Sequence, residues 1–403
     1  MQVETAKRVT TNESALCASA GGMEREFQSH ADNAREVSVS SEAEALRILV
    51  IAGGTGGHIF PALAVAEELL RRRPAATQFQ FLGTARGLET RLIEGAGFPY
   101  RALAAGGLKG IRGWHFIRNA ALLPRTFAEA GSALVGFRPD VVMGMGGYVA
   151  GPVMLEAALA GIPTLLIEPN ASPGFTNRVL GPVVTLAAIG FEEAAGCFGA
   201  KTRLTGIPVR RAFFEILPKN PHPPFTILIL GGSQGSAGLN HALVESLPRL
   251  AALPIPFSLI HQTGEREESL VREAYRQANV PAEVHAFIDD MPAAFAHADL
   301  VISRAGASSL AELAAAGKAA LLIPFPVAAD QHQLENARAF ERVGAARVVE
   351  QAELTAERLT GELTGLLSAP ERLVWMGEAA RGLARPDAAA RIADLIEGLA
   401  ASG

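Results

Sequence analysis

The segment Arg47-Ile-Leu-Val-Ile-Ala-Gly-Gly-Thr-Gly-Gly-His58 decides the fold of this 403-residue chain. Its apolar half, residues 47–52, is typical of a strand buried inside a parallel sheet. The glycines that follow suit a tight turn into a helix, and Pro61 fits the first helical turn because no amide donor is needed there. A strand, a glycine-rich turn and a helix in this order begin a βαβ unit, so we predict an α/β protein.

The same pattern returns in the second half of the chain. After a Pro-rich stretch at 217–224, a strand pattern at 226–230 runs into Gly231-Gly-Ser-Gln-Gly235. The segments 158–167 and 314–323 also match each other. Two echoes in the same order predict two Rossmann-like doubly wound domains that face each other across a cleft, where ligands bind at the carboxyl ends of strands. Further strands are expected at 79–82, 141–143, 164–167, 183–189, 257–260, 284–287, 300–302, 320–323 and 347–349.

Composition excludes several classes of protein. Hydrophobic residues make up 49% and charged residues 19%, which excludes a disordered chain. Lys plus Arg is 36 and Asp plus Glu is 41, and the net charge of −5 argues against a general nucleic-acid binder. Two cysteines cannot form a disulfide framework, and we find neither an apolar run of about 18 residues nor a signal peptide. A soluble cytoplasmic protein is therefore expected.

The loop 53–58 has the features of an anion-binding turn. Its glycines let the backbone approach a ligand, and the helix start offers amide donors and a partial positive charge. It is not a dinucleotide fingerprint, since Ile59 stands where the third glycine would be, and no Lys-Ser/Thr pair follows as in a Walker loop. His58, at the mouth of the helix, is expected to be neutral and able to accept a proton. A plain tight turn and a structural histidine are the alternatives.

The second glycine loop, 231–235, allows two interpretations. It fits the G-x-S-x-G pattern of a nucleophile elbow, and Asp299 and His332 follow in a workable order for a serine hydrolase. The loop also duplicates the first one, which has Thr55 and no candidate triad. We favour a second phosphate cradle with the Ser233 hydroxyl as a donor.

Two polar clusters follow later strands. In 303–312, Arg304 is expected to neutralise phosphate and Glu312 to bind ribose hydroxyls, although a favourable place for a carboxylate near a helix start is the alternative. In 330–336, Gln333 and Asn336 suit hydroxyl recognition, unless they only solvate a helix start. We expect no metal site, because no acidic or His-containing spacing supports one.

Basic residues gather between Arg101 and Arg138. Six basic residues and one acid give this segment a net charge of +5, which leaves −10 for the rest of the chain. Within it, Lys109, Ile111, Trp114 and Phe116 combine cations with bulky apolar groups, as peripheral membrane attachment requires. An amphipathic helix packed on the core is the alternative.

Together these motifs resemble the MurG-type N-acetylglucosaminyltransferases of bacterial peptidoglycan synthesis, from about Arg47 to the end. Further motifs that carry the resemblance are Gly144-Met-Gly-Gly-Tyr-Val-Ala-Gly-Pro152, Glu168-Pro-Asn170, Thr176-Asn177, Gly206-Ile-Pro-Val-Arg210, Phe287-Ile-Asp-Asp-Met291 and His332-Gln333. Two positions depart from the family pattern: Pro169 replaces a glutamine and Ile207 replaces an asparagine.

The resemblance implies an inverting GT-B glycosyltransferase without a cofactor or an obligatory metal. Such an enzyme transfers N-acetylglucosamine from UDP to the 4-hydroxyl of undecaprenyl-pyrophosphoryl-N-acetylmuramyl-pentapeptide, as a peripheral protein on the cytoplasmic face of the inner membrane, and binds no nucleic acid. A related lipid glycosyltransferase, a UDP-GlcNAc epimerase, a non-catalytic UDP-sugar-binding scaffold and a serine hydrolase are the alternatives.

By the family pattern, Ile288 meets the uracil, Ser233 the phosphates and Glu312 the ribose. Our own hypothesis, from its place at the helix start, is that His58 is the base. The UDP-GlcNAc contacts that the resemblance implies are Thr55, Gly56, Gly57, Asn170, Arg210, Ser233, Ile288, Arg304, Ala307, Ser308, Ser309, Leu310, Ala311, Glu312, His332 and Gln333. The expected organisation is a flexible extension at 1–45, an acceptor and membrane-side domain at 46–208, a linker at 209–224, a UDP-sugar domain at 225–375, and a C-terminal helix at 376–403 that packs back toward the first domain.

Overall fold

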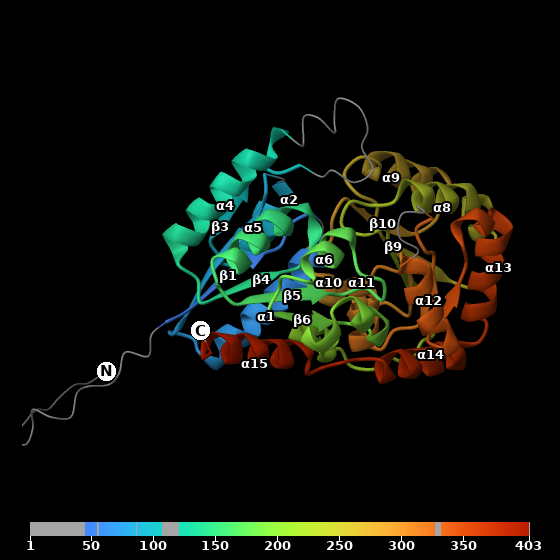
Figure 1. The fold of residues 1–403 in the computed structure, drawn as a ribbon. Coiled ribbons are helices and arrows are strands. Elements are labelled where there is room, and N and C mark those ends of the chain that lie inside the picture. Colours follow the sequence, from blue (N-terminus) through green and yellow to red (C-terminus); the bar gives the residue numbers. More distant parts are fainter. Residues whose placement is uncertain (1–44, 55, 86, 107–120, 327–331, 403) are drawn as a thin grey trace, which may run out of the picture. The chain divides into compact units, whose positions relative to one another are not determined.

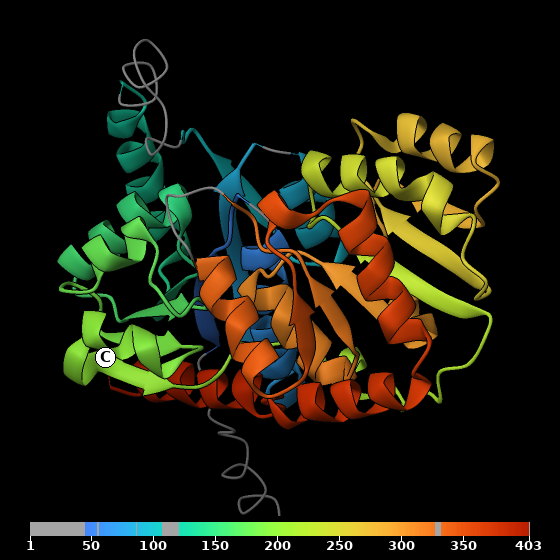
Figure 2. The same ribbon diagram turned by 90° about the vertical axis from the view of Figure 1, so that its right-hand side faces the viewer.

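The computed structural model describes residues 45–54, 56–85, 87–106, 121–326 and 332–402. Residues 45–403 belong to one compact unit, drawn in Figures 1 and 2. The expected extension, Thr55, the membrane segment with Lys109, Ile111, Trp114 and Phe116, and the side chain of His332 lie outside the described residues.

The first domain is built on a parallel sheet in the order β3-β2-β1-β4-β5-β6-β7. Its strands are β1 Leu46–Ile51, β2 Thr77–Thr84, β3 Tyr100–Leu103, β4 Val141–Gly144, β5 Thr164–Glu168, β6 Leu186–Ile189 and β7 Thr202–Leu204. The helices are α1 Gly56–Arg72, α2 Gly87–Gly95, α4 Leu123–Phe137, α5 Gly147–Leu159 and α6 Phe175–Leu180, with short 3-10 turns at Glu192–Cys197 and Gly199–Lys201. Side chains of α1 and α2 fill the core on one face of the sheet, and those of α4, α5 and α6 fill the other.

The second domain repeats this plan in the order β10-β9-β8-β11-β12-β13, again with parallel pairing throughout. Its strands are β8 Phe225–Leu230, β9 Phe257–Gln262, β10 Ala282–His285, β11 Leu300–Ser303, β12 Ala320–Leu322 and β13 Ala346–Val348. The helices are α7 Arg211–Phe214, α8 Ala237–Leu250, α9 Glu268–Gln277, α10 Met291–His297, α11 Ala307–Ala316, α12 His332–Arg342, α13 Ala356–Leu367 and α14 Pro370–Gly382, with a 3-10 turn at Gln351–Glu353. Helices α8, α9 and α13 cover one face, and α7, α10, α11 and α12 cover the other.

These orders confirm the predicted fold class of two Rossmann-like doubly wound domains. In each sheet the order reverses beside the first strand, between β1 and β4 and between β8 and β11. Ligands of such sheets bind at the carboxyl ends of the strands that flank this reversal. Both glycine loops follow those first strands, so the topology places them at the two expected binding edges.

The last helix, α15 Ala388–Ala400, returns to the first domain. Ile392 and Ile396 are fully buried in the core formed with α1, and Figure 1 shows α15 alongside α1. Arg72 of α1 donates hydrogen bonds to Asp394 at 2.6 Å and to Glu397 at 3.0 Å. Residue 376, where we expected this segment to begin, lies inside α14, which packs on the second domain.

The first half of the segment expected as a linker, residues 209–216, also packs on the second domain. Phe213 of α7 is fully buried there, with its ring edge-on to Phe295 at 5.2 Å between ring centres. In the part of the chain that the structure describes, no helix is long and apolar enough to cross a membrane.

Candidate active site

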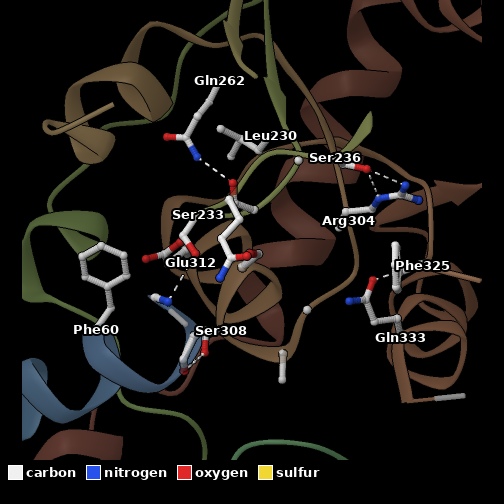
Figure 3. A pocket seen from close by; sticks show the side chains of 18 of the residues that line it. Phe60, Leu230, Ser233, Ser236, Gln262, Arg304, Ser308, Glu312, Phe325 and Gln333 are labelled. Carbon is white, nitrogen blue, oxygen red and sulfur yellow. Dashed lines mark hydrogen bonds between the residues drawn. The ribbon is translucent and has the colours of Figure 1, made fainter. Parts of the chain in front are cut away.

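A cavity of about 390 Å³ lies where the carboxyl edges of the two sheets meet (Figure 3). Loops after β1 and β5 of the first domain and after β8, β10 and β11 of the second line it. The sequence-predicted residues that line it are Gly56, Gly57, His58, Asn170, Ser233, Arg304, Ala307, Ser308, Ser309, Glu312 and Gln333. Residues distant in sequence thus converge on one site.

The two glycine loops touch each other across this cavity. The amide of Gly56 donates to Ser233 Oγ at 3.3 Å, and the Ser308 hydroxyl donates to the Gly57 carbonyl at 2.8 Å. Figure 3 shows both contacts as dashed lines. The N-termini of α1 and α11 both open on the cavity, so their amide donors and partial positive charge suit an anion there.

His58 has a defined tautomer. Its Nδ1 lies 3.0 Å from the carbonyl oxygen of Gly53. Because a carbonyl only accepts, this contact assigns the ring proton to Nδ1 and leaves Nε2 as an acceptor. In a neutral ring with this tautomer, Nε2 is the nitrogen that can accept a proton.

Glu312 and Arg210 form a buried charged pair beside the cavity. Arg210 Nη2 lies 3.7 Å from Glu312 Oε1. Burial raises the pKa of the Glu312 carboxyl to about 7, and the positive charge of Arg210 opposes this rise. The Arg210 guanidinium lies over the ring of Phe60, 4.5 Å from its centre, and its Nε and Nη2 bond to no acceptor among the described residues.

All five donor groups of Arg304 are already engaged by the protein. Nε and Nη2 donate to Ser236 Oγ, Nη2 also to Gln351, and Nη1 to the carbonyls of Ile323 and Pro324. Burial lowers the pKa of Arg304 to about 10. The structure thus differs from the expected direct phosphate contact, because such a contact would require some of these bonds to break.

Asn170 and Gln333 each have one polar end occupied. The backbone amide and Nδ2 of Asn170 both donate to Glu168 Oε1, at 2.8 and 3.0 Å. Gln333 Oε1 accepts from the amides of Ala305 at 3.2 Å and Phe325 at 3.0 Å. Asn170 therefore offers its Oδ1 acceptor to a ligand, and Gln333 offers its Nε2 donor.

Four predicted contact residues in the described ranges are not among those that line this cavity: Arg210, Ile288, Leu310 and Ala311. Leu310 is buried in the apolar core around α11, and Ala311 packs against that core while partly exposed. Ile288 lies in the loop after β10, and its amide donates to Gln262 Oε1 at 2.8 Å. Gln262 lines the cavity and was missed; its Nε2 also donates to the Gly232 carbonyl at 2.9 Å. Gln262 could have been predicted from the sequence, because polar residues end the strand that lies beside β8.

Other lining residues were also missed by sequence reasoning: Phe60, Ser236, Phe287, Met291 and Phe325. Of the two departures from the family pattern, Pro169 lines the cavity beside Asn170, and Ile207 is buried at 8% exposure.

The structure does not assemble the serine hydrolase triad. Ser233 follows β8 at the carboxyl edge of the sheet. Asp299 precedes β11, binds the amide of Thr226 and pairs with Lys219 at 2.8 Å, all at the amino edge. The two side chains therefore lie at opposite ends of the strands.

The adjacent acids 289 and 290 have separate structural partners. Asp289 pairs with Arg91 of α2 at 3.6 Å, whereas Asp290 caps α10 by accepting from the Ala293 amide at 3.0 Å. Over the ranges that the structure describes, no three His, Cys, Asp or Glu side chains form a cluster that could hold a metal ion.

Comparison with family models assigns both domains. Residues 48–189 match the N-terminal domain of glycosyltransferase family 28, and residues 226–392 match its C-terminal domain. The two matches correspond to the two sheets and contain both glycine loops.

Individual proteins give the same result. A curated relative from Anaeromyxobacter sp. (strain K), named UDP-N-acetylglucosamine--N-acetylmuramyl-(pentapeptide) pyrophosphoryl-undecaprenol N-acetylglucosamine transferase, is 46% identical over 87% of this chain and 92% of its own length. The crystal structure of Acinetobacter baumannii MurG is 34% identical, with a TM-score of 0.67, and covers 88% of this chain and 99% of that one. A UDP-GlcNAc 2-epimerase from Neisseria meningitidis, at 15% identity, 88% and 100% coverage and a TM-score of 0.61, shares the fold alone.

Proposed function

The chain belongs to glycosyltransferase family 28, and we infer that it transfers N-acetylglucosamine from UDP-N-acetylglucosamine to undecaprenyl-pyrophosphoryl-N-acetylmuramyl-pentapeptide. It is a UDP-GlcNAc-dependent glycosyltransferase of the GT-B type that acts in peptidoglycan synthesis. The sugar is joined to the 4-hydroxyl of the muramyl acceptor with inversion at the anomeric carbon. The observation that carries this function is the cavity that His58 lines together with the amide-rich turns of the other domain.

We propose that the second domain binds the UDP. Ile288 meets the uracil, the Glu312 carboxylate accepts from the ribose hydroxyls, and Ser233 with the amides at the start of α11 binds the phosphates. The contacts of Ser233 and Ser308 with the first glycine loop support this proposal, because they bring the amide donors of both domains to one place. Arg304 contributes its positive charge and positions Ser236.

The reaction itself needs a base and a stabilised leaving group. We propose that His58 Nε2 takes the proton of the acceptor 4-hydroxyl as its oxygen bonds to the anomeric carbon. The bond from that carbon to the UDP oxygen breaks, and its electron pair leaves with UDP. Arg210 is the group that we assign to this developing charge, because its buried Nε has no hydrogen-bond partner among the described residues and its Nη2 lies 3.7 Å from Glu312.

The remaining contacts position the sugar and the acceptor. Asn170 and Gln333 bind hydroxyls of the transferred sugar through the Oδ1 acceptor and the Nε2 donor. The first glycine loop, with the Gly57 amide, binds the acceptor pyrophosphate.

Product analysis tests this function. The full chain is incubated with radiolabelled UDP-GlcNAc and the lipid-linked muramyl-pentapeptide, and the label is followed by chromatography. We expect label in a lipid-linked disaccharide of inverted configuration. Label in a free or epimerised sugar would indicate an epimerase or a hydrolase, and UDP binding without any product would indicate a scaffold.

We further propose that the basic segment attaches the enzyme to the cytoplasmic face of the inner membrane. Its net charge of +5 in an acidic chain supports attraction to anionic lipid, and its bulky apolar side chains support insertion. The Trp114→Ala/Lys109→Ala double variant should sediment less with anionic liposomes than the unaltered chain. Equal sedimentation would contradict membrane attachment and favour the alternative that this segment packs on the protein core.

A further inference from the structure

A buried acid lies directly behind the first glycine loop. Glu89 of α2 is 1% exposed. Its Oε1 accepts from the amide of Gly54 at 2.6 Å and from the Thr84 hydroxyl at 2.7 Å, and its Oε2 accepts from the Thr84 amide and from the Tyr100 hydroxyl at 2.8 Å. Two backbone amides and the Thr84 hydroxyl donate to this carboxylate, whereas the Tyr100 hydroxyl divides its one proton between Glu89 and the Thr84 carbonyl, which lies 2.5 Å away. In the described parts of the chain no basic side chain pairs with Glu89. The site therefore offers Glu89 mainly donors, which suits a side chain that accepts.

The surrounding backbone leaves room for this carboxylate. A Cβ at Gly83 would lie 2.5 Å from Glu89 Oε2 and 2.6 Å from the Tyr100 hydroxyl oxygen. Burial, reinforced by the bond to Glu89, raises the pKa of Tyr100 above its usual range, so the phenol keeps its proton and stays a donor. The acid is thus held in place by the end of β2 and by β3.

One peptide group joins Glu89 to His58. The peptide between Gly53 and Gly54 has its N–H on Glu89 Oε1 at 2.6 Å and its C=O on His58 Nδ1 at 3.0 Å. A carboxylate on the N–H end makes the carbonyl a stronger acceptor, because successive hydrogen bonds polarise one another. A stronger acceptor at Nδ1 holds the ring proton there and favours the protonated imidazole.

We propose that Glu89 is a positioning residue that fixes the tautomer of His58 and raises its basicity through the Gly53–Gly54 peptide. The arrangement works as the acid of a catalytic triad does, with a peptide unit inserted between acid and histidine. The inference rests on the proposed role of His58 as base and adds a residue to that site. It also implies that the Gly54 amide, already bound to Glu89, does not serve a phosphate.

Other ionisable groups on neighbouring elements remain unchanged in the variants below. They are Tyr148, next to Gly147 where a Cβ would lie 3.6 Å from the His58 ring, Glu168 at the end of β5, Glu312 in the cavity wall, and Arg210 paired with Glu312.

Nitrogen NMR of the unliganded full chain, labelled at histidine, measures the tautomer and the pKa of His58 directly. His58→Gln assigns its signals among the nine histidines. We expect the Nδ1-protonated form in the unaltered chain. Glu89→Gln removes the negative charge and should lower the pKa of His58 by about half a unit or more. The acidic limb of the kcat/KM profile should move to lower pH in parallel.

A merely structural role for Glu89 predicts a different result. Suppose that folded Glu89→Gln loses activity while the tautomer and pKa of His58 and the acidic limb of the kcat/KM profile all stay unchanged. The proposed coupling of Glu89 to His58 through the Gly53–Gly54 peptide would then be wrong. Tyr100→Phe provides a second test, and the deciding one if Glu89→Gln does not fold. Tyr100→Phe removes one donor from the Glu89 carboxylate, so the carboxylate accepts more strongly from the Gly54 amide. The pKa of His58 should therefore rise, and an unchanged or lower pKa would contradict the proposal.

These NMR results are independent of the proposed function. If His58→Gln retained full transferase activity, His58 would not be the base. The coupling between Glu89 and His58 would still be decided separately, by the NMR measurements on the unliganded chain.

Discussion

Polar side chains around the cavity offer fixed donors and acceptors before any ligand binds. Glu168 holds Asn170, two backbone amides hold Gln333, and the Gly53 carbonyl holds His58. Each side chain therefore has one defined group free for the substrate. Preorganised groups of this kind need little rearrangement during the reaction, which is a large source of catalytic rate.

Replacement of His58 tests the assigned base. In His58→Gln we expect kcat to fall by roughly 10²–10⁴, because general base catalysis contributes that much, while UDP affinity stays within about twofold. Steady-state kinetics and UDP calorimetry measure the two. His241→Gln is the control, since this side chain is 60% exposed and pairs with Glu267 on the surface. Near-normal kcat in folded His58→Gln would refute the assignment.

Glu312 gives the protein a stability that depends on pH. Its folded-state pKa of about 7 lies above the ordinary 4.5, so its contribution is fully present below pH 4.5 and is lost as the pH rises through 7. Glu312→Gln does not titrate. The variant should therefore gain stability relative to the unaltered chain between pH 5 and pH 8, by at most roughly 3 kcal/mol. Thermal or urea unfolding at both pH values measures this gain.

The same change should weaken UDP binding about tenfold at pH 8, because a hydrogen bond to a charged acceptor is lost. Glu371→Gln, on the exposed first turn of α14, serves as the control and should alter neither quantity. A stability difference that shrinks from pH 5 to pH 8 would show that the Glu312 carboxyl is not destabilised by burial.

Motifs in the sequence predicted well which side chains line the cavity. They predicted less well which contacts those side chains make there. His58, Ser233 and Glu312 line the cavity as expected. Arg304 also lines it, but its donors bind carbonyl and hydroxyl oxygens of distant segments. Leu310 lies in the same motif but on the core side of its helix. Such differences depend on tertiary partners, which local sequence does not reveal.

At the scale of elements, apolar runs predicted the central strands of both sheets and the edge strands of the second sheet, but missed the edge strands of the first. The predicted strand 226–230 corresponds to β8, and 141–143 corresponds to β4. The edge strands β3 and β7 were missed, since each is short and half exposed and so lacks a continuous apolar run. Polar residues protect an edge strand from pairing with other chains, and the same residues interrupt the apolar run by which a strand is recognised in the sequence.

The second glycine loop has a backbone that other residues cannot follow. Gly235 has φ of +74°, and a Cβ there would lie 1.9 Å from the Thr263 carbonyl oxygen. We expect Gly235→Ala to lower the free energy of unfolding by roughly 2 kcal/mol or more and to weaken UDP binding, because the loop must move.

Gly361→Ala is the matched control for this loop variant. Gly361 is exposed inside α13, and a Cβ there would meet nothing within 4 Å. The alanine should leave UDP binding unchanged and stabilise the fold by about 0.5–1 kcal/mol. Urea unfolding and UDP titration compare the variants, and equal effects would show that the loop geometry is not required.

At the scale of the whole molecule, the chain crosses between the domains more than once. Residues 209–216 pack on the second domain, and α15 returns to the first domain after α14. Figure 2 shows α14 and α15 in red along one side of the molecule. The sequence predicted that a C-terminal helix returns, but its bounds depend on packing with α1.

Truncation of a buried side chain on α15 tests this return. Ile396→Ala should lower the free energy of unfolding by about 2–5 kcal/mol, because Ile396 is fully buried against α1. Hydrogen exchange should show greater loss of protection in β1 and β4 than in β8 and β11. Arg391→Ala, which removes an exposed pair with Asp387, should cost at most about 1 kcal/mol. Equal loss in both sheets would show that α15 does not belong to the first domain.

The account rests on one cavity that holds the donor sugar between a base from the first domain and amide-rich turns of the second. A crystal structure of the chain with UDP-GlcNAc bound tests this most directly. It should place the uridine at Ile288 and Glu312, the diphosphate at Ser233 and the start of α11, and the anomeric carbon facing His58 Nε2 with space for one hydroxyl between them. Uridine bound elsewhere, or an anomeric carbon turned away from His58, would contradict it.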